Sequence, residues 1–328
     1  MSAAEPGIAI VVPNWNGRSW LPGCLDAITA QDRAAAEVIV VDNGSTDGSL
    51  EYLAGEHPEV TVLALGRNTG FAGAANEGIR AARSELVALL NTDVVLDPDW
   101  LGRMAAALEA HAGAASAACK MLSLADHSRV YDAGDVLRRD GACEQRGRFG
   151  VDEGQWDQPG EVFGACAGAA LYRREAVLSI GGFDERFFAY LEDIDLAMRL
   201  RLAGWSCRYE PAVALHAGEG SSHQLSGGHQ HYVARNTILV VAKTFPPRWL
   251  GLVAYRQLGW AWHALHERRL RAHLGAVAAA LPLLPGALRE RRRLRATARV
   301  PIEAVIPRAP IRGRAPIRGG ALKAPVRR

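Results

Sequence analysis

The stretch LVALLNTDVVLDPDW, residues Leu86–Trp100, changes character in its middle. Its first five residues are all apolar, which is typical of a short strand buried on both faces of a sheet. The polar triplet Asn91-Thr92-Asp93 follows at once. Asp93 comes too early to cap the helix predicted after Pro98, so its carboxylate needs another partner at the edge of the sheet. We expect that partner to be a cation.

Three similar apolar runs precede this stretch, and helix-like segments separate them. Near-continuous apolar strands that alternate with amphipathic helices predict an α/β fold, Rossmann-like, with a mostly parallel sheet flanked by helices. Ligands of such sheets bind outside the carboxyl ends of the strands, and here those ends are polar. The predicted strands are Ile8–Val12, Glu37–Val41, Val60–Leu65 and Leu86–Leu90; the predicted helices are Trp20–Ala30, about Ser49–Ala54, Ala72–Arg83 and Asp99–His111.

The pattern is less regular in the second half of the chain. Between residues 116 and 164 Gly, Asp and Arg are interleaved, and we expect hairpins and a long loop. A strand is predicted at Gly168–Arg174 and a helix at Leu191–Ala203. Two more helices are predicted at Tyr232–Lys243 and Leu250–Leu274, so the chain has a C-terminal helical extension.

The C-terminal end is strongly basic, whereas the rest of the chain is acidic. Residues 289–328 hold 13 Lys and Arg against two acidic residues, in a chain of net charge +3. The hexapeptide RAPIRG occurs twice in tandem, and Pro, Gly and Arg at this density cannot bury a core. We expect a disordered basic tail beyond about residue 300. It indicates an anionic partner surface, and the absence of aromatic side chains for base stacking favours a membrane over nucleic acid.

Several features bear on the cellular compartment. The five cysteines are scattered without a CxxC spacing, which supports neither a disulfide framework nor a zinc site and fits a reducing cytosol. The first residues lack the basic and apolar regions of a signal peptide, and no apolar run reaches the roughly 18 residues of a spanning helix. Trp and Arg recur within residues 230–288, as in segments at a membrane surface, although a packing helix or a dimer contact explains them equally well. We expect a cytoplasmic protein, peripheral on the inner face of the cell membrane.

Two glycine-containing loops could bind a nucleotide. Asp42 closes the second strand, where a carboxylate can accept from a nucleobase N–H or a ribose hydroxyl, but it could equally form an Asx turn. The loop GRNTGFAGAANEG, Gly66–Gly78, places free backbone N–H groups at a helix N-terminus, which suits an anion. A turn with a helix cap is the simpler interpretation of that loop.

Three groups could carry chemistry. The oxygens of Asn91 and Asp93 suit Mg²⁺ or Mn²⁺, which then takes further ligands from substrate phosphates. Glu192 and Asp193 lie in the first turn of the predicted helix, where acids are common. Several aromatic residues directly precede them, however, and these predict the wall of a pocket. His216 ends an apolar run before a Gly-Ser loop, which suits a metal ligand. The aromatic residues are Phe183, Phe187, Phe188 and Tyr190.

Together these motifs resemble those of the family 2 inverting glycosyltransferases with the GT-A fold, most closely the bacterial rhamnosyltransferase-like branch. The resemblance covers roughly residues 8–245, and six motifs occur in the family's order, which makes it specific. The six motifs are VVPNWNG, VIVVDNGSTDGS, NTGFAGAANEGI, LLNTDVVLDPDWL, GGFDERFFAYLEDIDLAMRLRLAGW and HAGEGSS.

The resemblance implies a role for each candidate residue in binding a nucleotide-sugar donor. Asp42 and Asn14 would hold the base and ribose. Asn68, Gly70 and Asn76 would lie against the nucleotide.

The same resemblance implies the metal and the catalytic residues. Asn91-Thr92-Asp93 stands at the family's DxD motif, with Asp93 as a ligand of Mg²⁺ or Mn²⁺ and His216 completing the site. Asn91 departs from the motif, because an amide oxygen is a weaker ligand than a carboxylate. Asp193, the second acid of its pair after Glu192, would be the general base that deprotonates the acceptor hydroxyl.

The resemblance also implies the division of the chain. Residues 1–120 would form the nucleotide-sugar-binding half of the GT-A domain and residues 121–229 the acceptor-binding and catalytic half. Residues 230–288 would be the helical extension, for which a membrane contact is one interpretation, and the composition of residues 289–328 predicts a largely disordered tail. The QxxRW motif of processive synthases is absent, so we expect transfer of one sugar per binding event.

The implied reaction moves one sugar, by resemblance rhamnose from dTDP-rhamnose, to a hydroxyl of a glycan or lipid-linked glycan in cell-envelope polysaccharide synthesis. One alternative is a sugar-nucleotide pyrophosphorylase, but that enzyme needs a basic loop after the first strand, and PNWNGRSW has a single arginine. A second alternative is a non-enzymatic protein that binds anionic surfaces or nucleic acid through the tail. The oligomeric state is open.

Overall fold

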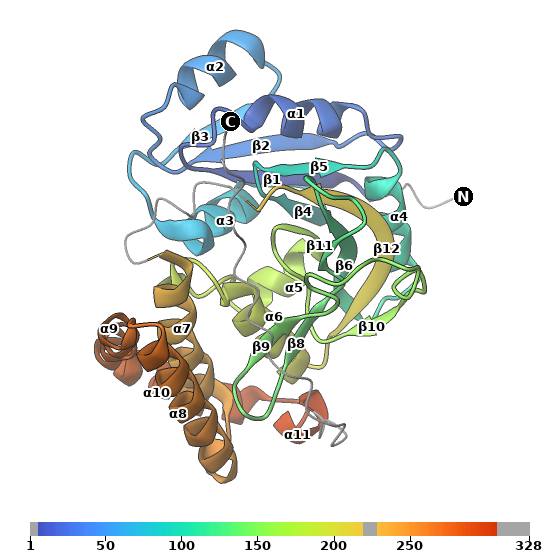
Figure 1. The fold of residues 1–328 in the computed structure, drawn as a ribbon. Helices are drawn as coiled ribbons and strands as arrows, with labels where there is room; N and C mark the ends of the chain where they lie inside the picture. The colour runs from blue at the N-terminus through green and yellow to red at the C-terminus, as the bar shows by residue number, and fades with distance from the viewer. Residues whose placement is uncertain (1–5, 219–227, 307–328) are drawn as a thin grey trace.

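A computed structural model describes residues 6–218 and 228–306. Its main feature is a ten-stranded mixed sheet with helices on both faces (Figure 1). The central order is β10-β12-β6-β11-β4-β1-β2-β3, with β5 added beside β12 and β7 beside β6. The expected α/β architecture is confirmed.

The first half of the chain contributes the parallel part of the sheet. The strands β1, β2, β3 and β4 all run parallel, in the order β4-β1-β2-β3. In this register Asn14 lies beside Asp42, so the carboxyl ends of β1 and β2 meet. The predicted elements are present to within a few residues: β1 (Ile8–Asn14), α1 (Leu21–Thr29), β2 (Glu37–Asp42), α2 (Ser49–Glu56), β3 (Thr61–Ala64), α3 (Gly70–Ala81), β4 (Leu86–Leu90) and α4 (Trp100–Glu109).

Alternation along the strands builds two apolar layers. In β1, Ile8, Ile10 and Val12 pack against α1 and α4, whereas Ala9 and Val11 face α3. Side chains of a strand point to opposite faces in turn, so an unbroken apolar run is what a sheet covered on both faces needs. Figure 1 shows α1 and α2 on one side of this sheet and α3, α5 and α6 on the other.

The second half adds antiparallel strands in the middle of the sheet. β11 runs antiparallel to both β4 and β6, and β12 runs parallel to β6. The short β5 pairs with the end of β12, which sets His216 opposite Val94. These elements are β5 (Val94–Leu96), β6 (Ala114–Ser123), β7 (Val130–Asp132), β8 (Asp135–Leu137), β9 (Cys143–Gln145), β10 (Gly160–Val162), β11 (Ala169–Arg173), α5 (Arg174–Ser179), η1 (Glu185–Phe187), α6 (Glu192–Leu202) and β12 (Ser206–His216).

The strand β6 corrects the expectation of hairpins and loop from residue 116 onward. Its sequence AASAACKMLS has no β-branched residue, so intrinsic preference does not predict a strand. Nine of its ten residues are buried, because β6 lies between β11 and β12 in the sheet. Small side chains suit a strand covered on both faces, and packing outweighs propensity here.

The C-terminal helices form a third apolar layer outside α6. Phe245 and Trp249 pack against Ile194, Met198 and other residues of the outer face of α6. The extension therefore belongs to the same body as the sheet, and Figure 1 shows it beside α6. Its elements are α7 (Gly228–Thr244), η3 (Pro247–Trp249), α8 (Leu250–His266), α9 (Leu270–Ala280), η4 (Leu281–Leu283), α10 (Leu284–Thr297) and α11 (Ile302–Val305).

Two expectations about this end need correction. The single helix predicted at Leu250–Leu274 is broken into α8 and α9, with Arg268 at φ 58° between them. The basic tail was expected to be largely disordered from residue 289, but α10 continues to Thr297, and Val305 and Ile306 are buried. The repeats of RAPIRG lie outside the described residues.

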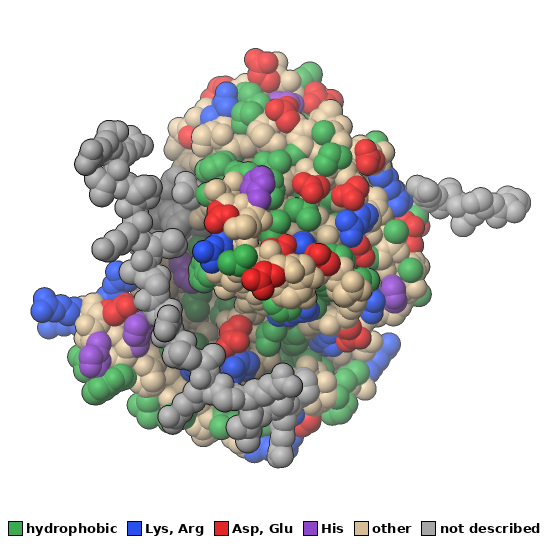
Figure 2. All heavy atoms as spheres, turned by 45° about the vertical axis from the view of Figure 1, so that its right-hand side comes forward, with side chains coloured by type: hydrophobic (Ala, Val, Ile, Leu, Met, Phe, Trp, Pro, Cys, Tyr) green, Lys and Arg blue, Asp and Glu red, His purple; other side chains and the backbone are tan. Residues whose placement is uncertain are grey.

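The charge and hydropathy of the surface are mixed. On the face in Figure 2, acidic and basic side chains are interspersed, so the acidic excess does not gather there into one patch.

Within the described residues, the segment Leu270–Thr297 is the one helical stretch long and apolar enough to cross a membrane. Its most apolar window has a mean hydropathy of 1.2 and is 17% buried. No such stretch was expected from the sequence.

Candidate active site

The ends of β1 and β2 are joined by buried polar side chains. Asn14 Nδ2 donates to Asp42 Oδ2 at 2.9 Å and to Ser45 Oγ at 3.1 Å. The other oxygen of Asp42 accepts from the backbone N–H groups of Gly44 and Ser45, at 3.2 and 3.0 Å. Asp42 therefore forms the Asx turn that was one of its two interpretations. Its contact with a nucleotide stays a prediction.

An unused acceptor lies in the same loop. Asn14 is fully buried, and its Oδ1 has no hydrogen-bond partner among the described residues. Gly17 lies directly above it, since a Cβ at Gly17 would be 2.5 Å from Asn14 Oδ1 and 2.9 Å from Thr92 Oγ1. Thr92 is thus brought next to Asn14, and the loops after β1 and β4 meet at this point.

Asn43 ties the end of β2 to the start of α3. Its Oδ1 accepts from Thr69 N at 2.8 Å, and its Nδ2 donates to Asn68 Oδ1 at 3.1 Å and to Gly70 O at 3.0 Å. The predicted residues Asn68 and Gly70 therefore lie beside the turn of Asp42. Asn43 was not among the predicted site residues, although its place directly after a buried strand is the signal that singled out Asp42.

Asn76 lies further along α3, and both atoms of its amide already have hydrogen-bond partners. Its Oδ1 accepts from Phe183 N at 2.8 Å, and its Nδ2 donates to Phe183 O at 2.9 Å and to Glu185 Oε1 at 3.0 Å. In this structure Asn76 therefore links the segment Phe183–Glu185 to α3 by hydrogen bonds. Its predicted contact with the nucleotide is untested.

The predicted metal residues come together at the end of β12. His216 Nε2 lies 3.6 Å from Asp93 Oδ1 and 3.2 Å from Asn91 Nδ2. The backbone strengthens this arrangement, since Ala217 N donates to Asp93 O at 3.0 Å. The His216 ring also stacks on Tyr131, with ring centroids 4.2 Å apart. Two segments distant in sequence thus present an imidazole and a carboxylate to one point.

The donor chemistry at this point fits a divalent cation. Asp93 and His216 are both buried, and His216 Nδ1 has no hydrogen-bond partner among the described residues. Burial lowers the pKa of His216, against the attraction of the Asp93 carboxylate, and thus favours the neutral imidazole that binds metals. Residues 6–218 and 228–306 contain no group of three or more His, Cys, Asp or Glu poised to hold a metal. A cation here would need further ligands from substrate phosphates, as Mg²⁺ commonly does.

The Glu192-Asp193 pair begins α6. Asp193 Oδ1 accepts from Ile194 N at 2.8 Å, and Asp193 Oδ2 accepts from Ala167 N at 3.3 Å. Burial nevertheless raises the pKa of Asp193. Burial and the charge of Asp193 raise the pKa of Glu192 well above its usual range, and Glu192 Oε2 has no hydrogen-bond partner among the described residues. One negative charge on the pair is therefore better held by Asp193 than by Glu192.

Two more carboxylates share this environment and were not predicted from the sequence. Burial raises the pKa of Asp132 to about 7 and that of Asp135 well above its usual range. The charge of Asp193 contributes to both shifts, so these acids lie close to the Glu192-Asp193 pair. In the sequence, YDAGD reads as an ordinary turn, and only the fold of β7 and β8 brings it to α6.

One dipeptide connects the two halves of the site. Ala167 N donates to Asp193 Oδ2, and the neighbouring Gly168 O accepts from Asn91 N at 2.8 Å. Adjacent α-carbons are ~3.8 Å apart, so the segment that carries Asp93 and the carboxylate of Asp193 border the same short piece of chain. A Cβ at Gly168 would lie 3.2 Å from Asn91 Nδ2, which shows how closely the segments approach.

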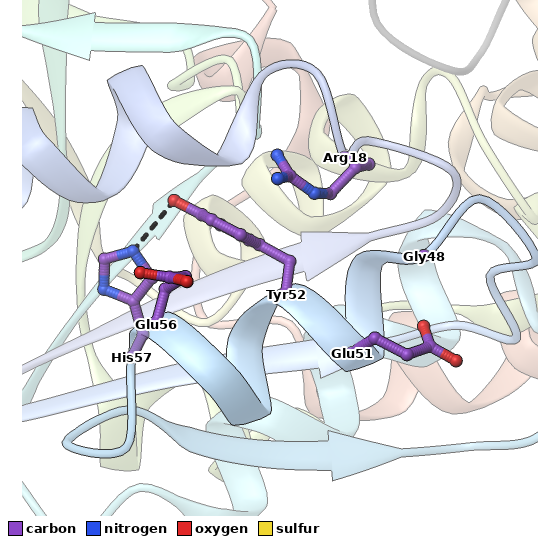
Figure 3. A pocket seen from close by; sticks show the side chains of 6 residues that line it. All are labelled: Arg18, Gly48, Glu51, Tyr52, Glu56 and His57. Atoms are coloured by element: carbon purple, nitrogen blue, oxygen red, sulfur yellow. Dashed lines mark hydrogen bonds between the residues drawn. The ribbon is translucent and has the colours of Figure 1, made fainter.

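A separate depression of about 570 Å³ lies over α2 (Figure 3). In it the Arg18 guanidinium lies 3.7 Å from the centre of the Tyr52 ring, and Tyr52 Oη is 2.9 Å from His57 Nε2. None of the predicted site residues lines it. In Figure 1, α2 and α6 lie at opposite sides of the sheet, so this depression is not part of the site around Asp193.

The profile of Glycosyl transferase family 2 matches residues 9–181, more than half of the chain. The chain belongs to this family. It is therefore a glycosyltransferase, and the expected enzyme class is confirmed. The matched stretch contains the Asn14, Asp42 and Asp93 loops and ends before Asp193 and His216, and the roles of all these residues remain predictions.

Curated relatives of this glycosyltransferase extend the match. It is 28% identical over 316 residues to the N-acetylglucosaminyl-diphospho-decaprenol L-rhamnosyltransferase of Mycobacterium tuberculosis, covering 87% of this chain and 96% of that one. It is also 24% identical over 207 residues to the poly-beta-1,6-N-acetyl-D-glucosamine synthase of Staphylococcus aureus, covering 62% of this chain and 48% of that one. The rhamnosyltransferase-like resemblance is thus confirmed.

Solved structures show the same fold. GalNAc-T7, crystallised with UDP, GalNAc and Mn²⁺, matches with a TM-score of 0.61 and 14% identity, over 75% of this chain and 49% of that one. The mannosyltransferase PcManGT of Pyrobaculum calidifontis, in complex with GDP-Man and Mn²⁺, matches with a TM-score of 0.54 and 21% identity, over 90% and 86%. The GT-A fold of this glycosyltransferase is confirmed.

Proposed function

We propose that this glycosyltransferase moves one sugar from a nucleoside-diphosphate donor to a hydroxyl of a lipid-linked glycan during cell-envelope polysaccharide synthesis. The observation that carries the proposal is the dipeptide Ala167-Gly168, which contacts both Asp193 and Asn91. It brings a candidate base and a candidate diphosphate site to one place. Similarity along nearly the whole chain to a rhamnosyltransferase that acts on a decaprenol-linked sugar supports rhamnose as the sugar and a polyprenyl-linked acceptor.

The donor would lie across the carboxyl ends of β1, β2 and β4. Asn14 and Asp42 are proposed to face the base and ribose, with Asn68 and Gly70 beside the nucleotide. Asn14 Oδ1, buried without a partner among the described residues, offers an acceptor there. The loop containing Thr92 adjoins it, so a diphosphate attached to the nucleoside would reach Asp93.

Asp93 and His216 are proposed to hold a divalent cation, Mg²⁺ or Mn²⁺, with Asn91 beside them. When bound, such an ion stabilises the negative charge that develops on the departing diphosphate. Asn91 presents Nδ2 to His216 in this structure, so direct coordination by its oxygen requires the amide to turn over.

Asp193 is proposed to take the proton of the acceptor hydroxyl as that oxygen attacks the anomeric carbon. Attack from the side opposite the leaving diphosphate needs one base and inverts the configuration. The N–H groups of Ile194 and Ala167 stabilise the carboxylate form, and burial together with the charge of Asp193 favours the protonated form of Glu192 beside it. We assign Glu192 the role of holding a proton next to the base.

The experiment is a transfer assay with a panel of nucleotide-sugars, including dTDP-rhamnose, and a polyprenyl-diphospho-N-acetylglucosamine acceptor. Transfer that Asp193→Asn lowers at least about 10³-fold, with donor binding retained, supports the proposal. Asp99→Asn is the matched control, since Asp99 lies at the start of α4 and pairs with Arg103 at the surface. Full activity of Asp193→Asn would overturn the assignment of the base.

We also propose that the extension holds the enzyme on an anionic membrane surface. On α8, large apolar side chains recur every three or four residues and stay exposed, with Tyr255 at 80%, Leu258 at 70% and Trp262 at 65%. An exposed apolar stripe with arginines near its end is typical of a helix that lies in a membrane interface. The other members of the stripe are Leu252 and Leu265, and the arginines are Arg268, Arg269 and Arg271.

Sedimentation with vesicles tests the membrane proposal. The protein should sediment with vesicles that contain anionic lipid, and Leu258→Glu with Trp262→Glu should abolish this at unchanged melting temperature. Binding to RNA in place of vesicles would support the alternative partner. A stable dimer that loses its second copy in the double variant would mean that α8 is a subunit contact instead.

A further inference from the structure

The chain enters α6 through a strained loop. Three residues other than glycine have a positive φ there, Phe188 at 65°, Tyr190 at 67° and Leu191 at 65°. Phe188 has ψ −66°, and Ala189 N donates to Phe187 O at 2.8 Å, which together make a classic γ-turn, a rare and strained conformation. Such conformations persist only where surrounding groups hold them, and they are concentrated at functional sites. The loop ends one residue before Glu192-Asp193.

The side chain of Asn236, on α7, binds the backbone of this loop. Its Nδ2 lies 3.0 Å from Phe187 O, 2.9 Å from Ala189 O and 2.6 Å from Tyr190 O. Asn236 is fully buried. An amide nitrogen with two hydrogens thus lies within hydrogen-bond distance of three carbonyl oxygens. These oxygens belong to the segment in which the backbone has unfavourable positive φ values.

Arg235 fixes the orientation of that amide. Arg235 Nε donates to Asn236 Oδ1 at 2.9 Å, and a guanidinium can only donate, so the amide oxygen must face Arg235 and the nitrogen must face the loop. The same guanidinium donates through Nη2 to Arg186 O at 3.1 Å and to Phe187 O at 2.5 Å. Two adjacent residues of one helix therefore carry five contacts to or beside the loop.

Two further contacts hold the loop. The Phe188 ring stacks on Tyr232 of α7, with centroids 5.6 Å apart and planes at 14°. From the other side, Ala72 N of α3 donates to Phe188 O at 3.1 Å, and Gly70 leaves room for that carbonyl. The loop is thus held between α3, which adjoins the nucleotide side, and α7, the first helix of the extension (Figure 1).

We propose that Asn236 is a positioning residue that sets the start of α6 and thereby the place of the Asp193 carboxylate. This rests on the proposed function, in which Asp193 is the base. Asp195 N donates to Leu191 O, so the first turn of α6 is built on the last residue of the strained loop. If Leu191 relaxes to a negative φ, the first turn rotates and Asp193 moves away from Ala167 N. The first role of α7 is therefore catalytic geometry, independent of any membrane contact of α8.

The test compares Asn236→Ser with Thr237→Val in the full chain. Thr237 is the matched control, because it is the next residue, is equally buried, and donates through its hydroxyl to Val233 O of its own helix. We expect Asn236→Ser to lower kcat about 100-fold with the donor KM changed less than about 3-fold. Thr237→Val should keep kcat within about two-fold. A loss of stability alone would affect both variants.

A second-site change separates positioning from stability. Leu191→Gly removes the steric cost of a positive φ, so it should recover about 10-fold of the kcat that Asn236→Ser loses, although loss of the partly buried Leu191 side chain lowers the melting temperature further. If Asn236→Ser does not fold, Arg235→Lys replaces it, and we expect its kcat to fall about 10-fold. Wild-type kcat in a folded Asn236 or Arg235 variant would overturn the proposal.

The outcomes for the two proposals differ. Asp193→Asn is assayed in parallel with Asn236→Ser. Transfer by Asp193→Asn would reject the base itself, whereas an inactive Asp193→Asn beside a fully active Asn236→Ser would reject only the positioning role. An equal loss in Asn236→Ser and Thr237→Val would reduce Asn236 to a stability residue and also overturn the proposal.

Discussion

The imidazole of His216 lies 3.6 Å from the carboxylate of Asp93, although the two residues belong to segments far apart in sequence. The pairing of β5 with the end of β12 brings them together, because it sets His216 opposite Val94. If these two residues bind the proposed cation, they supply only two ligands and leave several coordination positions for the substrate. The donor set therefore predicts an ion that binds weakly until the nucleotide-sugar arrives.

The first prediction concerns removal of the metal and its ligands. Transfer should stop in excess EDTA and return with Mn²⁺ or Mg²⁺, and His216→Ala should lower kcat/KM about 10²-fold and raise the Mn²⁺ concentration needed for half-maximal rate. His57→Ala is the matched control, since His57 follows α2 and its ring contacts Tyr52. It is not one of the predicted metal residues. Full transfer in EDTA would rule out the cation.

The second prediction is a displaced pH profile. Burial raises the pKa of Asp193, and a general base works only when ionised, so kcat/KM should rise with pH through an apparent pKa above the ordinary value of ~3.9 for aspartate. The charge of Asp193 raises the pKa of Asp132, which indicates that Asp193 ionises first, so Asp132→Asn should leave this acid limb in place. Asp99→Asn should leave it in place. An acid limb at the ordinary aspartate value would contradict the raised pKa of Asp193.

The third prediction concerns stability. The pKa of Asp132 is raised to about 7 in the folded protein, above its unfolded value, so the folded state binds the extra proton between about pH 4 and 7. Its contribution to the free energy of unfolding therefore falls as pH rises through this window. Asp132→Asn should stabilise the protein at pH 8 by roughly 1–3 kcal/mol and by much less at pH 4.5. Thermal unfolding at both pH values measures this, and an equal effect at both would contradict it.

The fourth prediction compares two glycines with similar backbone conformations. Gly70 has φ +78°, and a Cβ there would lie 2.3 Å from Phe188 O, whereas Gly66 has φ +69° and nothing within 4 Å. Alanine should cost roughly 1–2 kcal/mol at either position from backbone strain alone. Gly70→Ala must in addition displace the loop before Asp193, so we expect it to lower kcat at least about 10-fold, whereas Gly66→Ala keeps kcat. Equal kcat values would mean that the loop adjusts freely.

Much of the fold could be read from the first hundred residues. The strands from Ile8 to Leu90 are apolar on both faces and separated by amphipathic helices, so periodicity alone predicts a parallel sheet with its ligands at the carboxyl ends. The strand β6 could not be predicted in this way. Its Ala, Ser and Cys residues have little intrinsic preference for a strand, and its position between β11 and β12 comes from contacts distant in the chain.

The candidate site shows the same division. Asp93 could be singled out because local structure gives its carboxylate little to do, and Asp193 because several aromatic residues precede the acidic first turn of its helix. Asp132 and Asp135 gave no such signal, since acids in a glycine-containing turn are common and only β7 and β8 bring them to α6. Asn236 gave none either, because an asparagine within a helix has no local pattern that reveals three carbonyl partners on another segment.

The sequence by itself determined most elements of the first hundred residues, their apolar faces and the identity of the family, since periodicity and short motifs depend on neighbours along the chain. Only the tertiary structure decided which acids lie together, which protons they hold, and which helix supports the base. Those properties depend on burial and on charges a few ångströms apart in space, and a linear pattern does not specify such distances. In this glycosyltransferase, the loop before Asp193 is the clearest case, because its strained backbone is held by α7, which follows it in the chain.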